Sequence, residues 1–294
     1  IIGKETILCP CVKSNAYGHG SGECAFAFLE AGADWVCVNS IKEAGILRYA
    51  GVKAPIYILG YVALDDLFEV VELDLRIVVY NEETIARLAS FQKPVKVHLK
   101  AETGNNRQGL RKEELVNFAK YILQFENIEI EGICTHFANI EDTVDHSYAE
   151  KQLLEFDNCV KAIEDLGVKF KIRHCANSAA TILFPKTHFE MIRPGIAAYG
   201  LFPSAEIKDR SRLNLMPALT WKSRIAQIKS VPAGEYIGYG CSYKTERETK
   251  LAIIPVGYYD GYDRGIKGAH VLINGKRASV RGRVCMNIIM VDVT

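Results

Sequence analysis

The sequence predicts an α/β fold, a (β/α)8 TIM barrel followed by a smaller, mostly β domain. Between residues 7 and 200, short apolar strand-like segments alternate with helical segments, and eight such units follow one another. Parallel strands need a helical crossover between them, and eight strands close this kind of barrel. After residue 217 the helical period disappears while strand-like segments continue. We therefore predict a barrel domain over residues 1–213 and a mostly β C-terminal domain, incomplete at its end, over residues 214–294.

Each barrel strand is predicted from a short apolar run that is followed by a polar or glycine-rich break. The predicted strands are residues 7–13, 35–39, 56–59, 75–80, 95–100, 130–136, 170–174 and 191–193. Pro194 and Gly195 end the last of them. The alternative is an open, doubly wound sheet, which is disfavoured because no GxGxxG motif follows the first strand.

The helices between these strands are predicted from amphipathic periodicity and from their end signals. They are expected over residues 23–31, 42–49, 64–71, 82–90, 112–125, 147–166 and 178–183. Gly32 stops the first, and Asn81 has the position of an N-cap for residues 82–90. Residues 202–215 are polar and irregular, so we expect a linker there.

The second domain carries one strong turn signal. Asn274-Gly275 separates residues 270–273 from residues 276–280, and this dipeptide between two strand-like runs is typical of a β-hairpin. Residues 284–294 are predicted to form a further strand.

Composition excludes several classes of function. Net charge is +1 with both signs spread along the chain, so neither nucleic acid nor an anionic membrane is expected as a partner. No apolar run approaches the roughly 20 residues that span a bilayer. We expect no signal peptide, because the first residues lack a charged segment followed by a long apolar one. None of the nine cysteines lies in a CxxC pair, which is typical of free thiols in a reducing cytoplasm. The chain lacks an initiator Met, so we expect a processed product or a fragment.

Polar residues gather where predicted barrel strands end. These residues are Lys13, Asn39, Lys100, His136, His174 and Arg193. The carboxyl ends of the strands carry the active site in this fold. Six polar residues at strand ends are hard to explain as solvated edges, and we predict an enzyme with its site on this face.

Lys13 is the candidate nucleophile. Burial disfavours an ammonium group, so a lysine at the end of a buried strand can react as a free amine and form a Schiff base with an aldehyde. Tyr17, Gly18 and Gly20 follow in a loop suited to closing over a small ligand. The alternative is a surface lysine where a strand ends.

Two segments are suited to holding a phosphate. Asn177-Ser178 follows the seventh strand and Gly195-Ile196 follows the eighth, between which barrels often bind phosphate. Ordinary helix capping by Asn177 or Ser178 is the alternative. Arg193 precedes Pro194 and is therefore extended, and it either directs a fixed charge at a ligand or forms a structural salt bridge.

Other candidates lie in loops between glycines. Arg107 can contact a carboxylate or phenolate from its polar loop, although a solvated loop has the same composition. Tyr239 stands between two glycines, and Tyr258 lies in GYYDGY; both can instead pack as turn aromatics. His136 lacks partners at metal-site spacing, so no metal is expected.

Eight motifs together make the chain resemble the alanine racemase family, which depends on pyridoxal 5'-phosphate. They are VKSNAYGHG around Lys13, HLKAETGNNRQG around Arg107, THFA at His136, HCANSAA at Ser178, IRPGIAAYGLFP at Arg193, IGYGCSY at Tyr239, PVGYYDGY at Tyr258 and GRVCMN at Met286. They occur in family order and cover nearly the whole chain.

The resemblance implies a role for each matching residue. The catalytic bases would be Lys13, which also holds the cofactor as an aldimine, and Tyr239 of the partner subunit. The cofactor's phosphate would be surrounded by Tyr17, Asn177, Ser178, Gly195, Ile196 and also His174. Arg193 would face the pyridine nitrogen, with His136 beside it in a hydrogen-bond chain towards Tyr239. Substrate contacts would come from Arg107, Tyr258 and Met286, and Lys100 matches a position that is often carbamylated.

The resemblance also implies the reaction, which is interconversion of L- and D-alanine by a two-base mechanism. The enzyme would be a cytoplasmic homodimer with shared active sites, and it would supply D-alanine for peptidoglycan. Three residues depart from the family pattern. Asn105-Asn106 replaces Met-Gly before Arg107, and Asn287 replaces Asp after Cys-Met. These departures keep open a broad-specificity racemase acting on serine or basic amino acids. A non-enzymatic pyridoxal-phosphate-binding protein is a further alternative, but it would lack the second domain and Tyr239.

Overall fold

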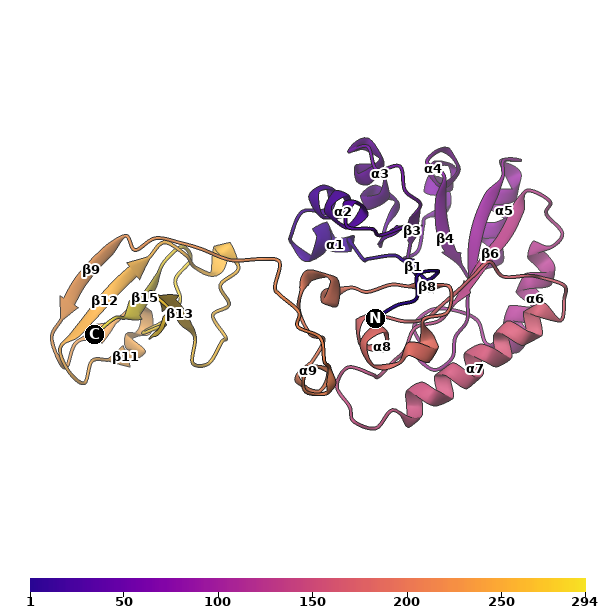
Figure 1. The fold of residues 1–294 in the computed structure, drawn as a ribbon. Helices are drawn as coiled ribbons and strands as arrows, with labels where there is room; N and C mark the ends of the chain where they lie inside the picture. Colours follow the sequence, from indigo (N-terminus) through magenta and orange to yellow (C-terminus); the bar gives the residue numbers. More distant parts are fainter. The chain divides into compact units, whose positions relative to one another are not determined.

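The computed structural model describes residues 1–294, which divide into two compact units. The first unit is Ile1–Leu219 and the second is Thr220–Thr294 (Figure 1). The boundary expected from the sequence lay at residue 213.

The first unit is a parallel eight-stranded barrel. Its strands are β1 (Ile7–Leu8), β2 (Val36–Val38), β3 (Ile56–Ile58), β4 (Leu75–Val79), β5 (Val95–Lys100), β6 (Ile128–Cys134), β7 (Ile172–His174) and β8 (Met191–Ile192). Strands β2 to β7 form one sheet in chain order, and β1 pairs with β8. A bridge between Cys11 and Cys37 joins β1 to β2. The Arg193 N–H donates to the Ala176 carbonyl (2.9 Å), which connects the ends of β8 and β7. The predicted barrel is confirmed.

Helices surround these strands (Figure 1). They are α1 (Lys13–Tyr17), α2 (Ser21–Glu30), α3 (Ile41–Tyr49), α4 (Leu67–Glu72), α5 (Glu82–Ser90), α6 (Lys112–Ile122), α7 (Ser147–Glu164), α8 (Ser178–Leu183) and α9 (Ala205–Arg210). The predicted cap is present, since Asn81 Oδ1 accepts a hydrogen bond from the Thr84 N–H (2.9 Å).

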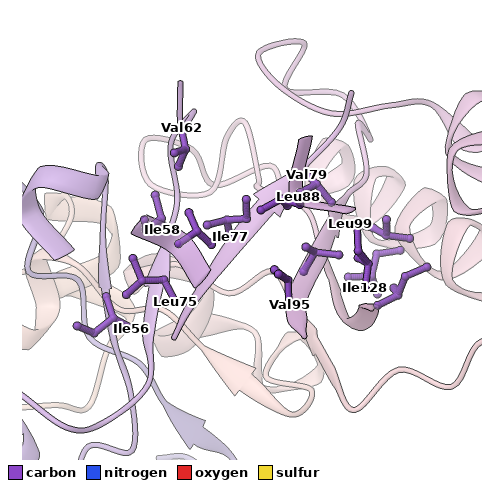
Figure 2. Close-up of a cluster of buried hydrophobic side chains, with 14 of the residues drawn as sticks. Ile56, Ile58, Val62, Leu75, Ile77, Val79, Leu88, Val95, Leu99 and Ile128 are labelled. Carbon is purple, nitrogen blue, oxygen red and sulfur yellow. The ribbon is translucent and has the colours of Figure 1, made fainter. Parts of the chain in front are cut away.

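Two apolar layers follow from the alternation of side chains along the strands. Ile56, Ile58 and Ile77 point outward into the large core beneath the helices (Figure 2). The residues between them, such as Tyr57 and Val78, belong to a second cluster inside the barrel. The barrel is therefore filled by side chains, and its interior positions can carry chemistry.

Two local expectations about unit 1 are wrong. The first strand was predicted to run to Lys13, but it ends at Leu8, and Lys13 begins a separate turn, α1. The linker predicted over residues 202–215 contains α9. Its N-cap is Ser204, whose Oγ accepts a hydrogen bond from the Ile207 N–H (3.2 Å).

The second unit is built from antiparallel strands. These are β9 (Gln227–Val231), β10 (Tyr236–Ile237), β11 (Tyr243–Lys244), β12 (Thr249–Ile254), β13 (His270–Ile273), β14 (Lys276–Ser279) and β15 (Ile289–Asp292). They form a three-stranded sheet, β15-β12-β9, and two two-stranded ribbons. Asn274 (φ 50°) and Gly275 (φ 76°) form the turn between β13 and β14, so the predicted hairpin is confirmed.

No helix combines the length and the apolar character needed to cross a bilayer. No group of three or more His, Cys, Asp or Glu side chains is arranged to hold a metal ion.

Candidate active site

A cavity of about 680 Å³ lies at the carboxyl ends of the barrel strands. Ten of the residues singled out from the sequence line it: Lys13, Tyr17, Lys100, Arg107, His136, Asn177, Ser178, Arg193, Gly195 and Ile196. They lie at or after the carboxyl ends of five different strands, so the barrel brings together residues that are far apart in the chain. Asn39, which was also predicted at a strand end, lines the cavity too, as do Tyr61 and Glu141.

The backbone around Lys13 is held from three sides. The Cys11 N–H donates to the Pro194 carbonyl (2.9 Å) and the Val12 N–H donates to the Cys37 carbonyl (2.8 Å). After the lysine, the Ser14 N–H donates to Glu43 Oε1 (2.7 Å) at the start of α3. These bonds fix where the Lys13 side chain enters the cavity.

The turn after Lys13 is left-handed. Ser14, Asn15, Ala16 and Tyr17 all have φ between 53° and 55°. Each such residue costs about 1–2 kcal/mol relative to ordinary helical backbone, because Cβ crowds the following carbonyl. Strain of this kind is typical of functional sites. The turn returns the Tyr17 side chain to the cavity that Lys13 lines.

A polar cradle forms where Tyr17, Ser178 and Gly195 meet. Ser178 Oγ accepts hydrogen bonds from the N–H groups of Gly195 (2.8 Å) and Ala197 (3.2 Å). A Cβ atom at Gly195 would lie 2.4 Å from the Tyr17 hydroxyl oxygen, so only glycine leaves the cradle open. Burial raises the pKa of Tyr17, which keeps its hydroxyl protonated and able to donate. The hydroxyls of Tyr17 and Ser178 can each donate a hydrogen bond, so the cradle suits an anionic group such as phosphate.

Asn177 caps a helix in the structure. Helix capping was the alternative to phosphate binding that the sequence left open for this residue. Its Oδ1 accepts a hydrogen bond from the Ala180 N–H (3.0 Å), and its amide donates to Glu141. Asn177 therefore fixes the start of α8, which presents Ser178 to the cradle.

Arg193 is a buried cation, only 7% exposed. Its guanidinium donates to Nδ1 of His174 and to the Thr135 carbonyl (3.0 Å). His174 Nε2 lies 2.7 Å from Nδ1 of His98, so both ring nitrogens of His174 are engaged. The expectation that His174 contacts a phosphate is therefore wrong: its ring faces Arg193 instead.

Burial and nearby positive charge lower the pKa values of two groups that line the cavity with Arg193. Burial, together with the cations Lys100 and Arg193, holds the pKa of His136 well below its usual range, so this imidazole is neutral. Burial also lowers the pKa of Lys100, with further lowering by Arg193 and Arg107. The cavity therefore favours a negatively charged ligand.

The loop that presents Arg107 is held by its own polar side chains. Glu102 Oε2 accepts a hydrogen bond from the Arg107 N–H (3.2 Å). The Asn105 amide approaches the His136 carbonyl (3.4 Å). Asn106 has φ 53°, a conformation that asparagine tolerates better than most residues. This explains how asparagine stands where the family pattern has glycine.

The remaining predicted residues lie in unit 2. Tyr239 is 71% exposed, in a turn between Gly238 (φ 72°) and Gly240 (φ 69°). Tyr258 and Met286 lie on neighbouring segments, because the Tyr258 N–H donates to the carbonyl of Cys285 (3.0 Å). Asn287 is exposed beside them.

Sequence reasoning missed two buried residues behind the cavity, His98 and Glu131. Both are less than 5% exposed. The signal for His98 was present, because a strand residue two positions before Lys100 points to the same side of the sheet. A signal for Glu131 was present too, because it alternates with the apolar residues Ile128 and Ile130, which belong to the outer core.

Family models for alanine racemase match the chain in both units. The N-terminal domain model matches residues 1–203, and the C-terminal domain model matches residues 218–294. The chain is 42% identical over 288 residues to an alanine racemase of Methanococcus maripaludis, covering 96% of this chain and 77% of that protein. It is 41% identical over 294 residues to one of Desulfovibrio desulfuricans, covering 98% and 78%.

Solved structures are similar as well. The structure of alanine racemase from Clostridium difficile 630 has a TM-score of 0.94 at 34% identity, covering 99% of this chain and 77% of that one. The Bacillus anthracis enzyme with bound L-Ala-P has a TM-score of 0.92 at 37% identity, covering 99% and 76%.

Proposed function

Because the chain belongs to the alanine racemase family, and therefore interconverts L- and D-alanine, we propose that Lys13 and Tyr239 are the two bases of the reaction. Inversion at Cα needs a proton removed from one face and returned on the other, so two groups on opposite faces are required. Lys13 lines the cavity, and Tyr239 is an exposed phenol between two glycines with positive φ. Tyr239 of the partner subunit would complete each site in a homodimer.

The cofactor in this proposal is pyridoxal 5'-phosphate. The cradle fits its phosphate, since Gly195 leaves room beside the Tyr17 hydroxyl. The residues that would hold it are Lys13, Tyr17, His136, Asn177, Ser178, Arg193, Gly195 and Ile196. When bound, the cofactor accepts electron density from Cα and so acidifies its proton. Lys13 would hold it covalently through its amine.

Arg193 is assigned to the pyridine nitrogen. A guanidinium does not give up its proton, so it can donate a hydrogen bond there but cannot protonate the ring. An unprotonated ring is a weaker electron sink, which restrains side reactions. Neutral His136 would stand beside Arg193 and accept or donate a hydrogen bond without adding charge.

Arg107 is assigned to the substrate carboxylate, with Tyr258 and Met286 contacting the substrate from the other subunit. Lys100 would be carbamylated. Burial lowers its pKa, which favours the neutral amine that reacts with carbon dioxide. A carbamate here would turn a buried cation into an anion able to orient Arg107.

The observation that carries these assignments is the convergence of Lys13 with the Tyr17–Ser178–Gly195 cradle in one cavity. The test is to incubate the purified chain and pyridoxal phosphate with one amino acid at a time, L-alanine, L-serine, L-lysine or L-arginine. The D-isomer formed in each reaction is then measured. We expect alanine to have the highest kcat/KM. Faster serine, lysine or arginine turnover would favour the broad-specificity racemase that Asn105, Asn106 and Asn287 keep open.

Replacing Gly195 with alanine should weaken cofactor binding. The added Cβ would lie 2.4 Å from the Tyr17 hydroxyl oxygen, so Tyr17 must leave the cradle. We expect the Kd for pyridoxal phosphate, measured by fluorescence titration, to rise about tenfold, equivalent to about 1.4 kcal/mol.

The matched control for that substitution is Gly45→Ala, on α3. A Cβ at Gly45 meets nothing within 4 Å, so this variant should bind the cofactor as the original chain does. Equal affinity of the two variants would contradict the assignment of the cradle to the phosphate.

The wider setting is also part of the proposal. D-alanine made by the enzyme would supply cell-wall peptidoglycan. A cytoplasmic location is supported by the cysteines, all nine of which are free thiols.

A further inference from the structure

A chain of polar side chains runs through the barrel interior behind Arg193. Arg193 contacts His174, His174 Nε2 lies 2.7 Å from His98 Nδ1, and His98 Nε2 lies 3.2 Å from Glu131 Oε2. All four side chains are at most 7% exposed. The last three residues have no role in the reaction as described so far.

Two features of the backbone are needed to build this chain. Strand β6 contains a β-bulge: Val97 pairs with Ile130 but His98 pairs with Gly132, so Glu131 has no partner residue on β5. A bulge changes the direction of the side chain it carries. Glu131 alternates with Ile130 and so points into the barrel, and the extra residue at the bulge lets Gly132 face His98 as well, before Ile133 returns to the outer core.

Gly132 makes room for the imidazole of His98. A Cβ atom at Gly132 would lie 2.8 Å from His98 Nδ1 and 2.6 Å from the Ile172 carbonyl oxygen. The His98 ring also packs against Tyr57, with ring centroids 4.9 Å apart, and Tyr57 contacts the His174 ring edge-on. The two histidines are therefore held in fixed orientations.

Hydrogen-bond chemistry allows the protons along this chain to be assigned. Arginine has only donors, so His174 Nδ1 must accept, and the proton of this imidazole lies on Nε2. That proton is donated to His98 Nδ1, which places the proton of His98 on its Nε2. The chain ends on Glu131, whose carboxylate can only accept. In each hydrogen bond of the chain, the donor therefore lies on the side of Arg193 and the acceptor on the side of Glu131.

The charges agree with this direction. Burial lowers the pKa of His98, and burial together with Arg193 holds the pKa of His174 well below its usual range, so both rings are neutral. Although burial raises the pKa of Glu131, the hydrogen bond from His98 and the cation Arg76 keep it below its usual value. Arg76 Nε lies 3.4 Å from Glu131 Oε2.

Arg193 needs such a chain because its direct partners carry no negative charge. They are an imidazole and a backbone carbonyl. A buried cation without compensation is strongly unfavourable. The two neutral imidazoles each turn their unprotonated nitrogen towards Arg193. The Glu131 carboxylate polarises them through the hydrogen bonds, and this strengthens the hydrogen bond that His174 accepts from the guanidinium.

We propose that His98 and Glu131 are positioning residues for Arg193: Glu131 reinforces, from the far end of the chain, the Nε2-protonated form of both histidines, and this keeps a hydrogen-bond acceptor facing the guanidinium. In the other tautomer, His174 would present an N–H to an N–H of Arg193, and the guanidinium would move. This inference rests on the proposed role of Arg193 at the cofactor ring.

The first test needs no substitution. Histidine ring ¹⁵N NMR on the full chain, with and without pyridoxal phosphate, distinguishes protonated from bare nitrogens. We expect His98 and His174 to be protonated on Nε2 and bare on Nδ1 in both samples. A proton on Nδ1 of either histidine would overturn the proposal, whatever the activity of the enzyme.

The second test compares Glu131→Gln with Glu129→Gln. Glutamine has the shape of glutamate but no charge, and it can present either an oxygen or an N–H to His98. Glu129 is two residues away on β6 and pairs with Lys171 on the protein surface. Both variants should be checked for folding by their thermal unfolding.

For Glu131→Gln we expect the preference for Nε2 protonation to weaken at His98, because glutamine can present an N–H to it. We expect kcat for alanine to fall about 10- to 100-fold, the range known for outer partners of metal-ligating histidines. KM for alanine should stay unchanged, because Arg107 is untouched. Glu129→Gln should change none of these. If the Glu131→Gln variant folds and keeps the histidine tautomers and the kcat of the unsubstituted protein, the proposal is refuted. If the unsubstituted protein does not racemise alanine, only the assigned reaction is refuted.

Discussion

Replacing Lys13 with alanine is expected to abolish racemisation and covalent attachment of the cofactor. The Lys13 amine is assigned both to proton transfer at Cα and to covalent attachment of the cofactor. The alanine side chain is neither a nucleophile nor a base, so it can do neither. Borohydride reduction followed by mass spectrometry should show the added mass of the cofactor on the original chain and none on the variant. The cradle of Tyr17, Ser178 and Gly195 is left intact, so loosely held cofactor should remain and should be removed by dialysis.

The control for this substitution is Lys42→Ala. Lys42 is exposed on α3, close in sequence to the site but outside the cavity lining. It should retain full activity and covalent cofactor. Retention of activity by Lys13→Ala would remove Lys13 from the mechanism, and reduction that labels another lysine would identify the correct one.

Mixing two inactive variants is expected to restore about a quarter of the original activity. In a two-fold dimer each contact occurs twice, so each site can take one residue from each chain. We propose that Lys13 comes from one subunit and Tyr239 from the other. Lys13→Ala alone should therefore inactivate both sites. Tyr239→Phe alone should cripple both, since phenylalanine has no proton to exchange.

When the two variants are unfolded and refolded together, random pairing makes about half of the dimers mixed. A mixed dimer has one site with both residues intact and one site with neither. Half of the sites in half of the dimers are whole, which gives the expected quarter. Native mass spectrometry should confirm that mixed dimers are present. If they form without recovery of activity, the shared site is wrong and Tyr239 loses its role as second base.

The positions of the candidate residues at strand ends could be predicted because they follow from periodicity. Strand β5 was predicted with the bounds it has, and α5 was predicted with its cap, Asn81. Short apolar runs that alternate with helices leave few topologies other than the barrel. Once the barrel is assumed, Lys100, His136 and Arg193 must share one face.

The turn after Lys13 could not be predicted. Four consecutive residues other than glycine adopt positive φ there, which local preferences disfavour at every position. They are held by long-range bonds, such as the one from the Ser14 N–H to Glu43. A pattern of residue types contains no information about such a bond before α3 is packed beside the turn.

The sequence by itself determined the order of the strands and helices. It also determined that Lys13, Arg193, Ser178 and Gly195 lie on one face, because this depends on local periodicity and on a topology with few alternatives. Only the tertiary structure decided that His174 faces Arg193 rather than a phosphate, and that His98 and Glu131 continue the chain behind it. The physical reason is that a bulge in β6 and the missing side chain of Gly132 change which groups meet inside the barrel. Such contacts depend on register and packing between strands, and a single strand read alone contains neither.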